Sequence, residues 1–351
     1  MIPTTRIFDG HNDVLTRTLK AGGVDAADKF LAGVKGHIDA PKAKAGNLGG
    51  GFFAIWIPTI EDLDDDLTLM EAPQYDIALP PATNPKNALQ ICMEETAILF
   101  RLEELGALKV CRNAADLRNC LENGTMAAIM HMEGAEAIDA DLHALEVMYR
   151  AGLRSLGPVW SRPTIFGEGV PFRFPGSPDT GGGLTEAGTR LVRRCNELGI
   201  MIDLSHITEK GFWDVARLSD APLVATHSNA HALCPHVRNL TDRQLKAIAE
   251  SDGMVGVNFA AAFLREDGRM LSDVPLAQML RHFDHLIYVL GEDRVGFGSD
   301  FDGAIVPREI GDASGLPNLV EAMRAHGYDD ALLAKLCHEN WLRVLQKTWG
   351  A

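Results

Sequence analysis

Short apolar runs rich in β-branched and aromatic residues alternate with amphipathic helical segments along nearly the whole chain. Eight such runs occur, at residues 7–8, 52–57, 126–132, 153–160, 200–204, 223–226, 254–259 and 295–298. Apolar strands that alternate with helices are typical of a parallel sheet with helical cover. Eight repeats favour a closed barrel over an open doubly wound sheet. The expected fold class is therefore α/β, a (β/α)8 TIM barrel.

Two of the intervening helices have clear ends in the sequence. Residues 185–198 carry apolar side chains at helical spacing, and the pattern stops at Gly199. Residues 275–290 show the same periodicity and stop at Gly291. A glycine directly after an amphipathic run is a common helix C-cap, so both segments are predicted to be helices that end there.

A barrel of this kind needs about 250 residues, which leaves roughly 100 for insertions. Insertions are expected after strands 1, 2 and 4, at residues 16–50, 61–85 and 163–183. The last segment is dense in glycine and proline, with phenylalanines interspersed, and both a lid over a site and a passive surface loop are compatible with it. Since no linker or composition break divides the chain, residues 1–351 are predicted to form one domain.

Charge and composition exclude several classes of function. The chain has 351 residues and a formal net charge of -15, without a basic run, which argues against a nucleic-acid partner. The acidic cluster at residues 61–66 is expected to be a solvated surface loop. No apolar stretch reaches the roughly 18 to 20 residues of a membrane helix, so no membrane partner is expected.

Compartment is inferred from the N-terminus and the cysteines. Residues 1–6 lead into the first strand without the basic and apolar regions of a signal peptide. The six cysteines lack C-x-x-C spacing and are expected to be reduced core thiols. The predicted location is cytoplasmic.

Residues able to bind metal ions follow five of the eight predicted strands, where barrel enzymes place their chemistry. They are His11 and Asp13 after the first strand, Glu133 after the third, His206 after the fifth, His227 after the sixth and Asp300 after the eighth. Nitrogen and oxygen ligands without thiolate suit Zn²⁺, with Mn²⁺ or Co²⁺ as alternatives. The set is too large for one tetrahedral ion, and two metals that share a bridging carboxylate fit the number of ligands.

Each residue also has a structural interpretation when it is considered alone. His206 and His227 are compatible with hydrogen-bonded core histidines, Glu133 with a helix N-terminal acid, and Asp300 with a cap of the turn at Gly303. The joint placement at successive strand ends favours metal binding.

Several neighbouring residues are not expected to bind metal. His131 lies two residues before Glu133 on the same face of the strand. It is expected to contact a metal-binding residue without binding the metal itself. His231 and His236 are expected to be structural, with contact to substrate as the alternative. Asn12 is expected to point away from the metals.

The segments around these residues resemble the renal (membrane) dipeptidase family of zinc peptidases, in order, from about Ile7 to Leu345. The similar segments are Phe8-Asp9-Gly10-His11-Asn12-Asp13, Met132-Glu133-Gly134, Ile202-Asp203-Leu204-Ser205-His206, Thr226-His227-Ser228-Asn229-Ala230 with Arg238-Asn239 following, and Gly296-Phe297-Gly298-Ser299-Asp300-Phe301-Asp302-Gly303.

The resemblance implies a binuclear zinc site in a (β/α)8 barrel. His11 and Asp13 would hold the first ion, His206 and His227 the second, and Glu133 would bridge them as part of the catalytic centre. Two ions would lower the pKa of a bridging water so that hydroxide attacks the amide carbon.

Two further residues receive roles from the same resemblance. Arg238 would pair with the substrate's C-terminal carboxylate, a task suited to a guanidinium fork. Asp300 would contact the substrate as the catalytic proton-transferring aspartate.

Two positions depart from the family pattern. Trp160 stands where the family has a histidine near the substrate carbonyl, so Trp160 is a candidate substrate-binding residue, and the metal, Arg162 or a lid residue would have to stabilise the tetrahedral oxygen. Cys234 resembles a disulfide-forming cysteine of the secreted mammalian enzymes, but no partner occurs near residues 264–267. This absence agrees with a reduced, intracellular protein.

Three functions are weighed. The leading hypothesis is a zinc-dependent dipeptidase for small dipeptides with a free C-terminus, including L,D-dipeptides, with a homodimer suggested by the resemblance. A related binuclear amidohydrolase acting on N-acyl amino acids is the alternative, although many such enzymes use a lysine on the fourth strand and residues 152–162 contain none. The third is a metal-binding protein without catalysis, against which Asp300 and Arg238 argue, since neither is needed to hold metal.

Overall fold

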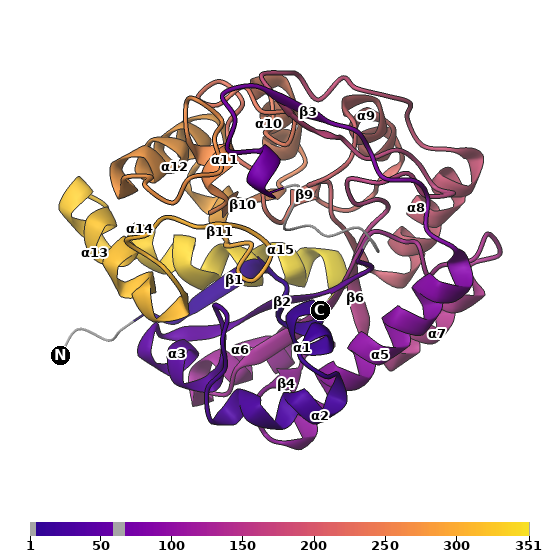
Figure 1. The fold of residues 1–351 in the computed structure, drawn as a ribbon, viewed down its shortest axis with the longest axis horizontal. Coiled ribbons are helices and arrows are strands. Elements are labelled where there is room, and N and C mark those ends of the chain that lie inside the picture. Colours follow the sequence, from indigo (N-terminus) through magenta and orange to yellow (C-terminus); the bar gives the residue numbers. More distant parts are fainter. Residues whose placement is uncertain (1–4, 59–66, 351) are drawn as a thin grey trace.

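A computed structural model describes residues 5–58 and 67–350. Within it, eight parallel strands form a barrel, and helices surround them (Figure 1). The barrel strands are β1 (Ile7–Asn12), β2 (Leu48–Trp56), β5 (Ala127–Glu133), β6 (Leu153–Gly157), β8 (Met201–Ile202), β9 (Val224–Ala225), β10 (Met254–Asn258) and β11 (Val295–Gly298). The acidic cluster at 61–66 lies outside the described residues.

The strands pair in the order β8-β6-β5-β2-β1-β11-β10-β9. A parallel bridge between Asp203 and Val224 joins the two ends of this order and nearly closes the ring. The predicted (β/α)8 barrel is confirmed. The fourth strand was predicted to reach residue 160 and is shorter, because Pro158, directly after Gly157, has no N–H to continue the ladder.

The described helices lie outside the barrel or in the loops at its ends. They are α1 (Val14–Lys20), α2 (Val24–Ala27), α3 (Ala40–Ala45), α5 (Pro85–Glu104), α6 (Ala114–Asn123), α7 (His143–Ala151), α8 (Glu186–Leu198), α9 (Glu209–Leu218), α10 (Asp242–Glu250), α11 (Ala261–Leu264), α12 (Leu276–Leu290), α13 (Leu316–His326), α14 (Asp330–Ala334) and α15 (Asn340–Trp349). The predicted ends of α8 and α12 are confirmed: Gly199 and Gly291 follow them with φ of 68° and 84°.

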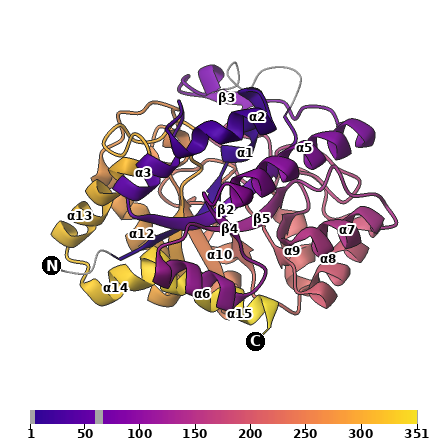
Figure 2. The ribbon, with the colours of Figure 1, turned by 90° about the horizontal axis from the view of Figure 1, so that it is seen from below.

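The expected insertions occur after β1, β2 and β6. The first contains α1 to α3, and the other two contribute β3 (Tyr75–Ile77) and β7 (Phe172–Phe174), which pair antiparallel in a two-stranded sheet. Figure 2 shows β3 at one end of the barrel and α15 at the other. A short strand β4 (Lys109–Val110), absent from the sequence prediction, pairs with β5.

Aromatic side chains fill the barrel near α15. The rings of Phe8 and Phe52 lie 5.8 Å apart, and the buried Trp341 of α15 lies 5.1 Å from Phe52. Gly10 lets β1 pass close to this layer, since a Cβ there would lie 2.6 Å from Trp341. Since this layer packs the interior, the polar side chains gather at the carboxyl ends of the strands, at the opposite end of the barrel.

Candidate metal centre

The structure brings all five predicted metal ligands together at the carboxyl ends of four strands. Every one is buried, with 0% to 7% of its surface exposed: His11 in β1, Asp13 directly after it, Glu133 at the end of β5, His206 after β8 and His227 after β9. Burial of so many ionisable groups in one place is costly unless they are paired or bind a cation.

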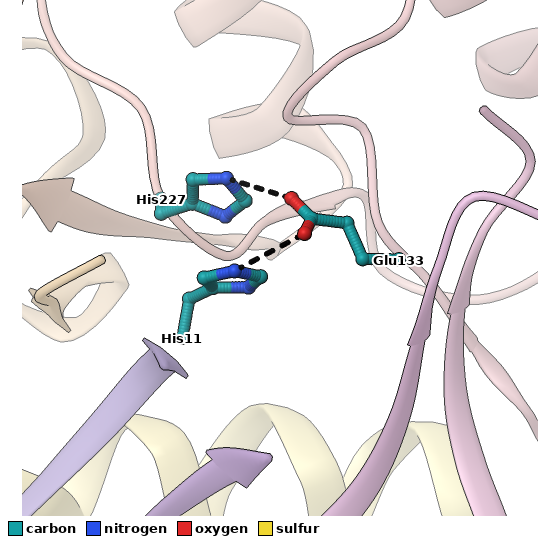
Figure 3. Close-up of side chains that lie close together, drawn as sticks. All are labelled: His11, Glu133 and His227. Carbon is teal, nitrogen blue, oxygen red and sulfur yellow. Dashed lines mark ion pairs between the residues drawn. The ribbon is translucent and has the colours of Figure 1, made fainter. Parts of the chain in front are cut away.

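Glu133 lies at the centre of the cluster. Its Oε2 is 3.5 Å from His11 Nε2, and its Oε1 is 3.0 Å from His206 Nε2 and 3.5 Å from His227 Nε2. Figure 3 shows the carboxylate between His11 and His227, with one oxygen directed at each. One oxygen therefore faces His11 and the other faces the histidine pair, which is the arrangement expected of a bridging carboxylate.

His11 has buried nitrogen atoms that the described chain does not satisfy. Neither its Nδ1 nor its Nε2 has a hydrogen-bond partner among the described residues. Its ring stacks on that of His227 at 3.9 Å, and its Nε2 is 3.5 Å from Asp13 Oδ2. A buried ring nitrogen without a partner requires an explanation, and a metal ion held with Asp13 and Glu133 provides one.

Hydroxyl groups hold the other two histidines through their Nδ1 atoms. Ser161 Oγ is 3.0 Å from Nδ1 of His206, and Thr226 Oγ1 is 2.8 Å from Nδ1 of His227. Thr226 Oγ1 also donates a 2.6 Å hydrogen bond to Asp203. Such contacts fix the rings and direct both Nε2 atoms toward Glu133, as metal-binding histidines require.

The sequence analysis missed these supporting residues. Asp203 accepts from the backbone N–H of both Ser205 and Thr226, so it ties the end of β8 to the end of β9. Its position three residues before His206 was the available signal. Asp9 was missed as well: it is buried, accepts two hydrogen bonds from Ser299, and burial raises its pKa to about 6.

The protonation states of His206 and His227 suit metal ligands. Burial lowers the pKa of His206 and His227 well below the ordinary value, which favours the neutral imidazole that binds metal. Burial opposes charge on His11 too, but the carboxylates of Glu133 and Asp13 outweigh it and raise the pKa of His11. Burial also raises the pKa of Glu133, to about 7. The carboxyl groups of Asp13 and Glu133 each lie 3.5 Å from His11 Nε2, and a cation bound among the three would stabilise both as carboxylates.

Asp300 lies beside His11 and Asp13. Ligand atoms of His11, Asp13 and Asp300 lie within 4.8 Å of one another. Asp300 has a left-handed backbone with φ of 59°, and the Asn258 amide donates a 2.9 Å hydrogen bond to its Oδ2. Burial raises the pKa of Asp300 above its usual range. A carboxyl held in this way can accept a proton at the centre.

Arg238 is buried on the opposite side of the cluster from Asp300, beside His206 and His227. Only 2% of its surface is exposed, and its guanidinium donates to the carbonyl oxygens of Ser205 and His227. Its Nη2 is 3.2 Å from His206 Nε2. Within the described ranges, no carboxylate lies within 4 Å of this cation, and its Nε has no partner.

Trp160 is 6% exposed and lines the cavity over the cluster. Its ring lies 5.8 Å from His206 and 5.1 Å from Trp56. Arg162, which was considered as a replacement for the family histidine, is fully buried, bonded to Glu136 and Ile57, and does not line the cavity. Arg162 instead places its guanidinium 5.4 Å from the Trp160 ring.

Three other histidines lie near the cluster. His131 packs its ring edge against His11 at 5.6 Å and contacts Ser155 through Nδ1 at 2.8 Å, in agreement with the prediction that it contacts a ligand. His231 lies 2.7 Å from the carbonyl oxygen of Gly176, and His236 Nδ1 accepts from the Arg238 N–H. Both histidines thus contact backbone groups of the surrounding loops, in line with the structural role expected for them. Asn12, as expected, points elsewhere and donates to the carbonyl of Phe52.

The family comparison matches the membrane dipeptidase family, peptidase family M19, over residues 1–349. A metallopeptidase from Rhodobacter sphaeroides, crystallised with a phosphinate mimic of the dipeptide L-Ala-D-Ala, is 57% identical with a TM-score of 0.97, over 99% of this chain and 100% of that one. The crystal structure of dipeptidase AC, also of family M19, is 57% identical with a TM-score of 0.95, over the same shares.

A relative without a described function is similar as well. A protein from the pqqA 5' region of Klebsiella pneumoniae is 52% identical over 267 residues, which are 76% of this chain and 98% of that protein.

Proposed function

This chain belongs to the membrane dipeptidase family, and we propose that it cleaves small dipeptides with a free C-terminus at the centre built around Glu133. Membership makes the chain a metal-dependent hydrolase that acts on dipeptides. The residue roles, the number and identity of the metals, and the details of the substrate are our proposals.

The observation that carries the choice of substrate is the unpaired cation of Arg238. A buried guanidinium without a carboxylate partner among the described residues is costly, and a substrate carboxylate would compensate it. Since Arg238 lies 3.2 Å from His206, that carboxylate would be close to the metal ligands. A dipeptide has the required geometry, because its free carboxylate is one residue away from its amide bond.

We propose that His11 and Asp13 hold one Zn²⁺, that His206 and His227 hold a second, and that Glu133 bridges them, with Mn²⁺ or Co²⁺ as alternatives. The buried nitrogen of His11 without a partner and the converging Nε2 atoms of the other two histidines fit this assignment. The bound ions would polarise the amide and activate water for attack on its carbon.

Asp300 would carry the proton. Its carboxylate would take a proton from the attacking water and deliver it to the leaving amine, while Asn258 holds the orientation of the carboxylate. Trp160 would bind substrate by its ring face and exclude water from the cavity. Because its ring is apolar, the side chain at this position would not polarise the amide carbonyl.

The crystallised relative supports L,D-dipeptides as substrates, because its ligand mimics L-Ala-D-Ala. Hydrolysis of L,L-dipeptides, L,D-dipeptides and N-acyl amino acids by the metal-loaded protein tests the proposal. We expect dipeptide turnover, whereas turnover of N-acyl amino acids alone would replace the proposal by the amidohydrolase alternative. The family assignment does not favour that alternative.

We further propose that the protein is a cytoplasmic homodimer and that residues 1–351 form one domain. No helix among the described residues is long and apolar enough to cross a membrane. All six cysteines are free and buried, which agrees with a reducing compartment.

A further inference from the structure

Three aromatic side chains form one wall of the cavity, and we call Trp160, Phe172 and Phe263 the aromatic wall. All three line the cavity. The ring centroids of Trp160 and Phe172 lie 5.7 Å apart, and those of Phe172 and Phe263 lie 6.4 Å apart with the rings nearly parallel. These contacts make a continuous aromatic surface on one side of the cavity, which Trp56, Met70 and Met270 also line.

The aromatic wall lies on the Arg238 side of the metal centre. The Arg238 guanidinium is 5.4 Å from the Phe263 ring centroid, and the Trp160 ring is 5.8 Å from that of His206. Asp13 and Asp300 instead follow β1 and β11, which are across the barrel from β6 and β8. A dipeptide whose carboxylate reaches Arg238 therefore brings its C-terminal side chain, and not its N-terminal one, to the aromatic wall.

Phe172 differs from the other two residues because it comes from β7 in the small two-stranded sheet. Figure 2 shows the other strand of this sheet, β3, at one end of the barrel. This sheet is fixed to the segment that carries Arg238. Val237 N–H donates to the Arg173 carbonyl at 3.4 Å, and Gly176 N–H donates to that of Pro235 at 2.8 Å. On the other strand, Tyr75 donates a 2.7 Å hydrogen bond to the Gly268 carbonyl.

The β6 insertion therefore holds Phe172 and the Arg238 segment in one hydrogen-bonded unit. Of the two interpretations left open for residues 163–183, the position of Phe172 in the cavity favours a cover over the site.

We propose that Phe172 is a specificity-determining residue that selects dipeptides with an apolar side chain at the C-terminal residue. This inference rests on the proposed function, since it takes the orientation of the substrate from Arg238. An apolar side chain there would be removed from water between the rings, whereas glycine would leave the aromatic wall without a partner and a charged side chain would lose its hydration. The N-terminal side chain would not contact Phe172.

The test compares two substrate series on the zinc-loaded full chain. In one, L-Ala is followed by Gly, D-Ala or D-Leu; in the other, Gly, L-Ala or L-Leu is followed by D-Ala. We expect kcat/KM of the parent to rise about tenfold or more from C-terminal Gly to D-Leu. In Phe172→Ala, kcat/KM should fall about tenfold for the D-Leu substrate and stay within about twofold for the C-terminal Gly substrate.

Ile77→Ala is the matched control. Ile77 pairs with Phe172 across the small sheet but does not line the cavity, so its variant weakens the same sheet without opening the aromatic wall. It should leave the preference for D-Leu unchanged. Equal losses on all C-terminal residues in Phe172→Ala, or a loss confined to the N-terminal series, would overturn the assignment while dipeptidase activity stands. A parent that hydrolyses no dipeptide would overturn the proposed function itself.

Discussion

The Nε2 atoms of His206 and His227 lie 3.1 Å apart, and both face the same oxygen of Glu133. Their Nδ1 atoms are occupied by hydroxyl groups, and burial keeps both rings neutral. Two neutral nitrogen donors and a carboxylate oxygen that converge in this way form half of a metal site before any ion is bound.

Metal removal should destabilise the protein. An ion that binds only the folded state stabilises it by about 4 kcal/mol at a free concentration of 1,000 times its Kd. We expect the midpoint of thermal unfolding to fall by several degrees after chelation and to recover when zinc is restored. His227→Ala should reduce that recovery, whereas the control His326→Ala, at an exposed position, should keep it. Identical melting curves with and without zinc would argue against a tight site.

Asp300→Asn should remove proton transfer while the metal remains. The amide keeps the size of the side chain and its contact with Asn258 but does not accept a proton, so kcat should fall about 10²- to 10⁴-fold. Metal content per chain, measured by atomic absorption, should equal that of the parent. Asp220→Asn, at an exposed position outside any cluster of possible metal ligands among the described residues, is the control. Parental turnover by Asp300→Asn would refute the role given to Asp300.

Arg238→Met should abolish recognition of the free C-terminus. The parent should prefer L-Ala-D-Ala over its C-terminal amide by about 10²-fold or more, because a buried charge pair is formed only with the carboxylate. In the variant, the ratio of the two kcat/KM values should approach one. The exposed Arg243→Met serves as control and should retain the preference. A preference that survives in Arg238→Met would place the carboxylate elsewhere.

Arg162→Met should destabilise the fold. Arg162 and Glu136 form a buried ion pair of 3.1 Å, with 0% and 3% of their side chains exposed. Removal of the cation leaves Glu136 buried and uncompensated, at a cost of about 3 to 5 kcal/mol in the free energy of unfolding. The double variant Arg162→Met with Glu136→Gln should regain part of this loss in urea unfolding. A single variant as stable as the parent would show that the pair contributes little.

The sequence predicted the barrel and the ligands because both depend on local patterns. Eight apolar runs set the strands, and His11, Glu133, His206 and His227 stand at or just after strand ends, which parallel strands bring to one rim. The ends of α8 and α12 were predictable for the same reason, since a glycine with positive φ follows each.

Contacts between distant segments were not predictable in this way. The pairing of β3 with β7 depends on two insertions about 100 residues apart, and each strand is only three residues long, too short for its alternation of apolar and charged side chains to predict a strand. The support of Thr226 by Asp203 and the burial of Arg162 behind Trp160 also arise only when the barrel closes. The orientation of Trp160 therefore had to come from the structure.

Titration of the metal-free protein with zinc, followed by hydrolysis of L-Ala-D-Ala, tests the central claim most directly. The proposed centre predicts no turnover without metal and a rate that rises to a plateau at two zinc ions per chain. Turnover by the metal-free protein, or no turnover when both sites are filled, would contradict it.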